Sequence, residues 1–147
     1  MRMLLSRQGV PYAHQLHYMQ MVTEKLARSY LADPRTQPQK THVGFVRLLQ
    51  QAKRGRESRE IRRRLGYGDD RVFAKFIDSL LPLARQVEEL APVLAGMARP
   101  NPEYPWKDLA SGEIVVPVDF AFPQFSPKLP QMLKLTSLVE NLLAIAE

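Results

Sequence analysis

The chain contains no cysteine among its 147 residues. That absence excludes a disulfide framework, thiolate zinc sites, iron–sulfur clusters and a cysteine nucleophile. No apolar run approaches the roughly 20 residues that a membrane-spanning helix requires. The opening MRMLLSRQGVP is also too poor in apolar residues to serve as a signal peptide. We therefore expect a cytoplasmic protein with no membrane contact.

The length and the charge of the chain indicate the number of domains and the kind of partner. A chain of this length is typical of one domain, so we expect residues 1–147 to form a single folding unit. There are 21 basic and 15 acidic residues, which gives a net charge of +6, and 14 of the basic residues are arginine. The planar arginine side chain suits phosphate and carboxylate groups, so the composition favours a nucleic-acid or acidic-protein partner.

Apolar residues recur at spacings of three and four in five segments, which predicts helices. The predicted ranges are 11–31, 42–53 with Thr41 as N-cap, 56–65, a long helix from the Asp69-Asp70 pair to Leu94, and 131–146. Pro82 lies inside the long helix and predicts a kink or a restart there. We therefore expect an all-α protein, an up-and-down bundle of about five helices.

Residues 99–130 have a different character. Seven prolines exclude a long helix, whereas several aromatic residues favour burial. Val116, Val118, Phe120 and Phe122 alternate as in an extended chain, but Pro117 and Pro123 disfavour a central strand. We expect an extended strap across the bundle, without a convincing strand pair.

The segment NPEYPW (101–106) within this strap allows two interpretations. Exposed Tyr104 and Trp106 would suit a partner-binding or dimer surface, because aromatic side chains often anchor interfaces. Alternatively, the same side chains would be buried over an open seam of the bundle.

The densest basic run predicts a nucleic-acid-binding surface. Its candidate residues are Lys53, Arg54, Arg56, Arg59 and Arg63, and the helical spacing of the last three lets them contact successive phosphates. Glu57 and Glu60 also lie in this run, so a solvated helix held by ion pairs is the alternative. No aromatic residue is interleaved, which disfavours a base-stacking platform.

The sequence offers no other site for chemistry. His14 and His17 are three residues apart, but no third ligand completes a metal site, so we expect no metal and no cofactor. The carboxylate pairs, such as Glu88-Glu89, lack the setting for acid–base catalysis. The turn at Gly66-Tyr67-Gly68 lacks the lysine and hydroxyl of a phosphate-binding loop. We assign no catalytic residue from these patterns.

Two segments carry a family resemblance. The predicted first helix contains HYMQMVTEKLARSYL (17–31), and the second helix begins KTHVGFVRLL (40–49). Together they resemble HEPN domains, the higher eukaryote and prokaryote nucleotide-binding family, over about residues 12–94. The resemblance implies a helical bundle that is often a homodimer, with a nucleotide, RNA or a nucleotidyltransferase as partner. Glu24 and Lys25 would then be structural or interface residues.

Many HEPN domains are RNases marked by an arginine that precedes a histidine by a few residues on a late helix. Here the nearest matches are Arg35 with His42 and Arg7 with His14, both near the start of the chain, and no histidine follows His42. We therefore expect a non-catalytic nucleotide-, RNA- or protein-binding module. The alternatives are an RNase or toxin, with His42 as general acid/base and Arg35 holding the phosphate, and an antitoxin-like regulator that binds through its strap.

Overall fold

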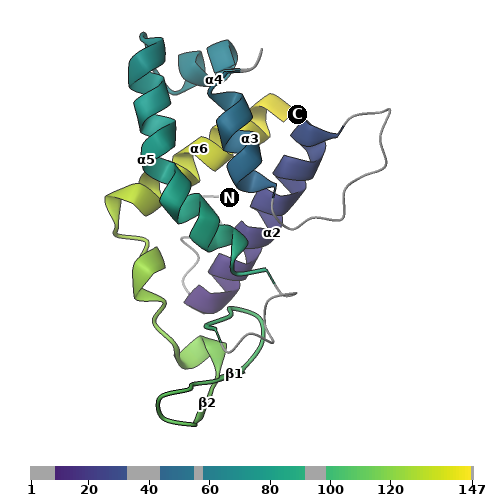
Figure 1. Cartoon of the computed structure of the whole chain (residues 1–147), viewed down its shortest axis with the longest axis vertical. Coiled ribbons are helices and arrows are strands. Elements are labelled where there is room, and N and C mark those ends of the chain that lie inside the picture. Colours follow the sequence, from purple (N-terminus) through teal and green to yellow (C-terminus); the bar gives the residue numbers. More distant parts are fainter. Residues whose placement is uncertain (1–8, 33–43, 55–57, 92–98, 147) are drawn as a thin grey trace.

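Five α-helices dominate the computed structural model, which describes residues 9–32, 44–54, 58–91 and 99–146 (Figure 1). They are α2 (Tyr12–Leu31), α3 (Phe45–Ala52), α4 (Ser58–Arg64), α5 (Asp70–Glu88) and α6 (Pro130–Ala146). The predicted all-α helical bundle is confirmed. The helices lie close to the predicted ranges because the apolar spacing matches the helical repeat.

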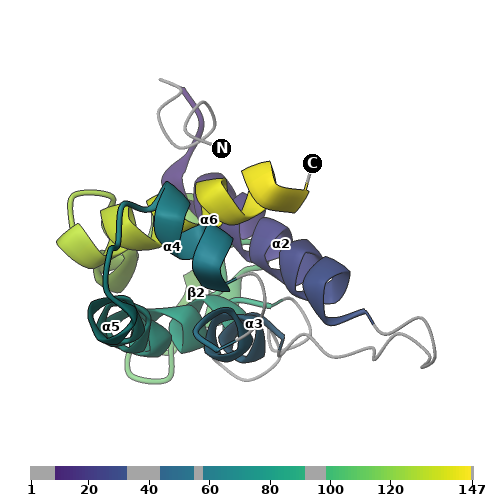
Figure 2. The ribbon, with the colours of Figure 1, turned by 90° about the horizontal axis from the view of Figure 1, so that it is seen from above.

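The core lies where four of these helices meet. α3 packs against α2 and α5, while α6 packs against α5, α2 and the short α4. The end-on view shows the helices surrounding this interior (Figure 2). The largest fully buried side chains come from all five helices and from the strap: Leu16, Met19, Phe45, Leu49, Ile61, Phe73, Ile77, Leu80, Phe122, Phe125, Leu135 and Leu138.

Helix α5 continues through Pro82, so of the predicted kink or restart the restart is wrong, and the helix bends along its length (Figure 1). Asp69 caps its N-terminus by accepting hydrogen bonds from the backbone N–H groups of Arg71 and Val72, at 2.7 and 2.9 Å. The Pro82 side chain is exposed, so its ring meets solvent rather than the core. The helix ends at Glu88, and the predicted extension to Leu94 lies partly outside the described residues.

The strap contains a short hairpin that the sequence did not predict. Strands β1 (Trp106–Lys107) and β2 (Ile114–Val115) are antiparallel, with Trp106 opposite Val115 and Lys107 opposite Ile114. Two 3₁₀ turns follow, η2 (Pro117–Asp119) and η3 (Pro123–Phe125). The extended chain expected over 116–122 is therefore interrupted, because Pro117 begins a tight turn with its fixed φ.

Buried aromatic side chains fasten the strap to the bundle. Phe122 and Phe125 lie in the core, and the hydroxyl of Tyr12 on α2 donates a hydrogen bond to the carbonyl of Phe125. Burial raises the pKa of Tyr12, so this hydroxyl remains a donor at neutral pH. The strap is thus a fixed part of the fold.

Candidate nucleic-acid interface

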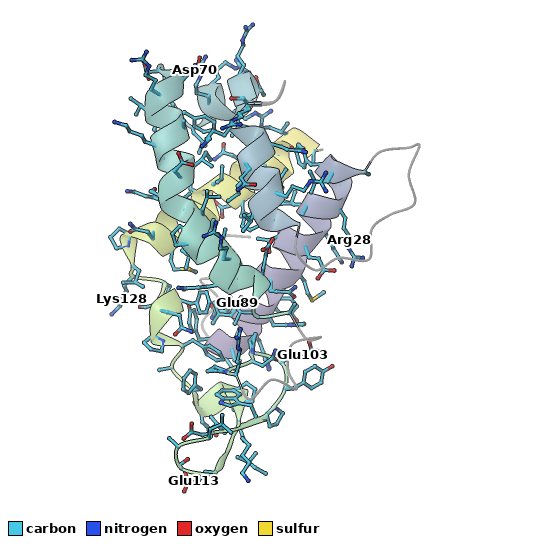
Figure 3. All side chains as sticks on the ribbon, viewed as in Figure 1. Arg28, Asp70, Glu89, Glu103, Glu113 and Lys128 are labelled. Carbon is cyan, nitrogen blue, oxygen red and sulfur yellow. The ribbon has the colours of Figure 1, made fainter. Side chains whose placement is uncertain are left out.

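The predicted basic residues lie at one end of the molecule. Lys53 and Arg54 follow α3, Arg59 and Arg63 belong to α4, and Arg56 lies outside the described residues. Helix α5 begins at the same end, where Asp70 is labelled in Figure 3. The described residues from 48 to 54 and 58 to 78 include eight basic and four acidic side chains, so this end is positive.

Ion pairs neutralise part of this charge. Lys53 Nζ lies 2.7 Å from Asp78 Oδ1, and Arg62 pairs with Asp70. Glu60 accepts hydrogen bonds from Arg63 and Arg64, with N–O distances of 2.8 and 2.9 Å. The hydrogen bonds from Arg63 and Arg64 lower the pKa of Glu60 to about 2, so the carboxylate is ionised at neutral pH. Much of α4 is thus a solvated helix held by ion pairs, which is the alternative to a nucleic-acid-binding surface.

Other cations at this end have no carboxylate partner among the described residues. They are Arg54, Arg59, Arg71 and Lys75, and all four side chains are exposed. Arg71 and Lys75 share a face of α5 with Asp78, because the spacings are four and three residues. Since Asp78 contacts Lys53 at the end of α3, this face borders the predicted basic run.

We define the basic surface as Arg54, Arg59, Arg63, Arg71 and Lys75. The sequence interpretation missed Arg71 and Lys75, although their spacing of four on a polar helix face was a usable signal. Arg63 belongs to the surface because its side chain is 75% exposed even while it contacts Glu60.

The basic surface offers charge but no aromatic platform. Tyr67 lies nearby, yet its ring is half-buried, with its centroid 4.9 Å from that of Phe76 and 5.6 Å from that of Phe73. Burial raises the pKa of Tyr67. Because its face is occupied by these rings, the arrangement suits contacts with phosphate groups rather than base stacking.

The two aromatic residues predicted to bind a partner have different environments. Trp106 is 6% exposed and packs edge-on against Phe120, with 5.1 Å between the ring centroids. Tyr104 is 47% exposed. Trp106 is thus buried against the bundle, as the second interpretation of residues 101–106 predicts, while Tyr104 is exposed at the surface.

The histidines form no metal or catalytic cluster in the described part of the chain. His14 is exposed, and Nδ1 of His17 lies 3.5 Å from Oε2 of Glu103. No group of three or more potential ligands occurs among residues 9–32, 44–54, 58–91 and 99–146. Arg7, Arg35 and His42 lie outside these ranges, so the RNase alternative stays a prediction.

Glu88 has a structural role that the sequence interpretation missed. Its carboxylate is buried at the N-terminus of α3 and accepts a hydrogen bond from the backbone N–H of Val46, at 2.9 Å. The N-cap residue of α3 is Gly44, which makes no side-chain capping hydrogen bond. The predicted cap, Thr41, lies outside the described residues. Glu88 thus supplies a hydrogen-bond acceptor for the N-terminus of α3.

Comparisons of the chain with protein-family models, with curated proteins and with solved structures give no match. The HEPN resemblance therefore stays a prediction. In the part of the chain that the structure describes, no helix combines the length and the apolar character needed to cross a membrane.

Proposed function

We propose that the protein is a non-catalytic, HEPN-like helical bundle that binds RNA through phosphate contacts with the basic surface. The observation that carries this proposal is the group of exposed cations contributed by two helices and the end of a third. When exposed guanidinium groups contact phosphates, they displace the cations condensed on the RNA, and this counterion release drives sequence-independent binding.

The ion pairs set the expected strength of binding. Glu60 occupies Arg63 and Arg64, and Asp78 occupies Lys53, so only part of the local charge is available. The four cations without a described carboxylate partner define the main contacts: Arg54, Arg59, Arg71 and Lys75. We expect modest affinity with little sequence preference, because no described aromatic ring at this surface is positioned to read bases.

A salt titration with a single-stranded RNA oligonucleotide of mixed sequence tests the proposal. The triple variant Arg59→Gln, Arg71→Gln, Lys75→Gln removes three charges from the basic surface, each from a cation without a described carboxylate partner. Each lost phosphate contact lowers the magnitude of the slope of log affinity against log salt by about 0.7, so the slope should fall by about two.

The matched control is the triple variant Lys107→Gln, Lys128→Gln, Lys134→Gln. It removes the same net charge from exposed positions outside the basic surface. The control should retain the wild-type slope. Equal effects of the two triple variants would show that net charge alone governs binding, and an unchanged slope in the first would exclude the basic surface.

The absence of catalysis is tested separately. The same RNA incubated with the wild-type protein and with His42→Ala should remain equally intact. Cleavage that disappears in His42→Ala would establish the RNase alternative instead.

A further inference from the structure

Exposed apolar side chains concentrate on the β1–β2 hairpin. Nine large hydrophobic residues are exposed in the described part of the chain, and five of them fall between residues 104 and 118. These five, which we name the hairpin surface, are Tyr104, Leu109, Ile114, Val116 and Val118. Single exposed apolar residues are ordinary, whereas such a concentration marks an interaction site.

The register of the hairpin explains why Ile114 at its centre faces solvent. Trp106 and Val115 form one cross-strand pair, and Trp106 is buried against Phe120. Lys107 and Ile114 form the adjacent pair on the opposite face, where Ile114 is 75% exposed. Ile114 is therefore directed outward because the other face of the same hairpin packs against the core.

The hairpin is an ordered element. The N–H of Gly112 donates to the carbonyl of Asp108 at 2.8 Å, and Ser111 Oγ donates to the Asp108 carboxylate at 2.7 Å. Gly112 has a φ of +74°, a left-handed conformation that glycine adopts easily. Because its geometry is fixed in the free chain, the hairpin surface loses little conformational freedom when it binds.

The charge around the hairpin surface is negative. Residues 103–119 contain a single basic side chain, Lys107, and four acidic ones: Glu103, Asp108, Glu113 and Asp119. The basic surface lies at the other end of the molecule, as the positions of Glu113 and Asp70 show (Figure 3). Val72, beside Arg71 on α5, is 54% exposed, so the positive end also offers an apolar contact.

We propose that the hairpin surface of one molecule docks on the basic surface of a second copy. The two surfaces are complementary in charge, and exposed Val72 beside the basic surface offers an apolar contact to the hairpin surface. A symmetric pairing of two hairpins would instead bring the acidic residues of both copies together, which is unfavourable. The two surfaces occupy opposite ends of one chain, so the contact is head-to-tail and can add further copies.

Sedimentation velocity of the full chain tests this association. The mean mass should rise with protein concentration at low salt, and raising the salt from about 0.05 to about 0.5 M should weaken association several-fold, because exposed charges are screened. Ile114→Ser should weaken association by about fivefold or more. The control Leu133→Ser changes an equally apolar, exposed position on α6 and should leave association unchanged.

Charge reversal identifies the two surfaces. Glu113→Lys and Arg71→Glu should each weaken self-association several-fold while leaving thermal unfolding unchanged, because both side chains are exposed. A mixture of the two variants should associate again, since one variant retains the wild-type hairpin and the other retains the wild-type basic surface. Recovery on mixing is the result that supports a head-to-tail contact.

Three results would overturn the proposal. A chain that stays monomeric at every concentration would show that the hairpin surface does not bind a second copy. Association that persists in Ile114→Ser would place the contact elsewhere. Association that is lost in Glu113→Lys but unchanged in Arg71→Glu would show that the hairpin surface contacts a part of the second copy other than the basic surface.

Discussion

Glu88 and Val46 join the end of α5 to the beginning of α3. Oε1 of the Glu88 carboxylate lies 2.9 Å from the backbone nitrogen of Val46. Burial raises the pKa of Glu88 above its ordinary value of 4.5, while the N–H groups of Val46 and Phe45 and the charge of Arg85 oppose that rise. Burial therefore outweighs these favourable contacts, so the folded state disfavours the ionised form of the Glu88 carboxyl.

Removing the Glu88 side chain should destabilise the fold. Glu88→Ala leaves the N–H of Val46 without its acceptor, so we expect the free energy of unfolding to fall by about 1–3 kcal/mol. Urea denaturation measures this change. Glu89→Gln is the control, because the neighbouring Glu89 carboxylate is exposed, and its effect should stay within about 0.5 kcal/mol.

The raised pKa of Glu88 also predicts a pH dependence. Between pH 4.5 and the raised pKa, the folded state retains a proton that the unfolded state has released. The contribution of Glu88 to stability therefore falls as the pH rises through this window. Glu88→Gln cannot titrate, so its stability relative to the wild type should increase between about pH 4 and about pH 7. A constant difference would contradict the role of Glu88 as a buried acid.

Gly44 allows α3 to approach α2 closely. A Cβ at this position would lie 2.9 Å from the Cβ of Ala27, and neither atom can rotate away. Gly44→Ala should therefore lower the free energy of unfolding by about 1–3 kcal/mol. Gly68→Ala is the control, since a Cβ there meets nothing within 4 Å. If Gly44→Ala combined with Ala27→Gly loses as much as the two single variants together, the proposed clash is absent.

The helices were predictable because their signals are local. The apolar spacing of 11–31 predicted α2 to within one residue, and Asp69 was correctly expected at the start of α5. The acceptor at the start of α3 comes from Glu88, 42 residues later in the chain. No local pattern identifies such a partner, and the sequence alone therefore predicts a nearby residue, Thr41, as the cap.

The hairpin and the extent of the basic surface depend on contacts distant in sequence. Each strand has only two residues, too few to show an alternating pattern. The basic run at 53–64 was visible in the sequence, but the contact between Lys53 and Asp78 is what places Arg71 and Lys75 beside it. The pairing of Arg62 with Asp70 likewise joins residues eight apart across the turn between α4 and α5.

Trp106 and Tyr104 should respond oppositely to truncation. Trp106→Ala removes a buried indole that packs against Phe120 and Phe122, so the free energy of unfolding should fall by about 3 kcal/mol. Tyr104→Ala removes an exposed ring and should change it by less than about 0.5 kcal/mol. Urea denaturation of both variants measures the difference. Similar losses in the two variants would contradict this placement.

Glu60 limits the charge that the basic surface can offer to RNA. Its ionised carboxylate occupies both Arg63 and Arg64, so Glu60→Gln should make two more cations available. We expect tighter RNA binding at low salt and a steeper slope of log affinity against log salt, by up to about 1.4 for two added contacts. Circular dichroism checks that α4 remains helical in the variant.

Glu89→Gln is the matched control for Glu60→Gln. It removes the same negative charge from an exposed carboxylate that pairs with Arg99, at the end of α5 distant from Arg71 (Figure 3). Because salt screens distant charges, this substitution should leave the slope unchanged. If both variants raise RNA affinity equally, the effect reflects net charge, and the ion pairs of Glu60 do not control access to Arg63 and Arg64.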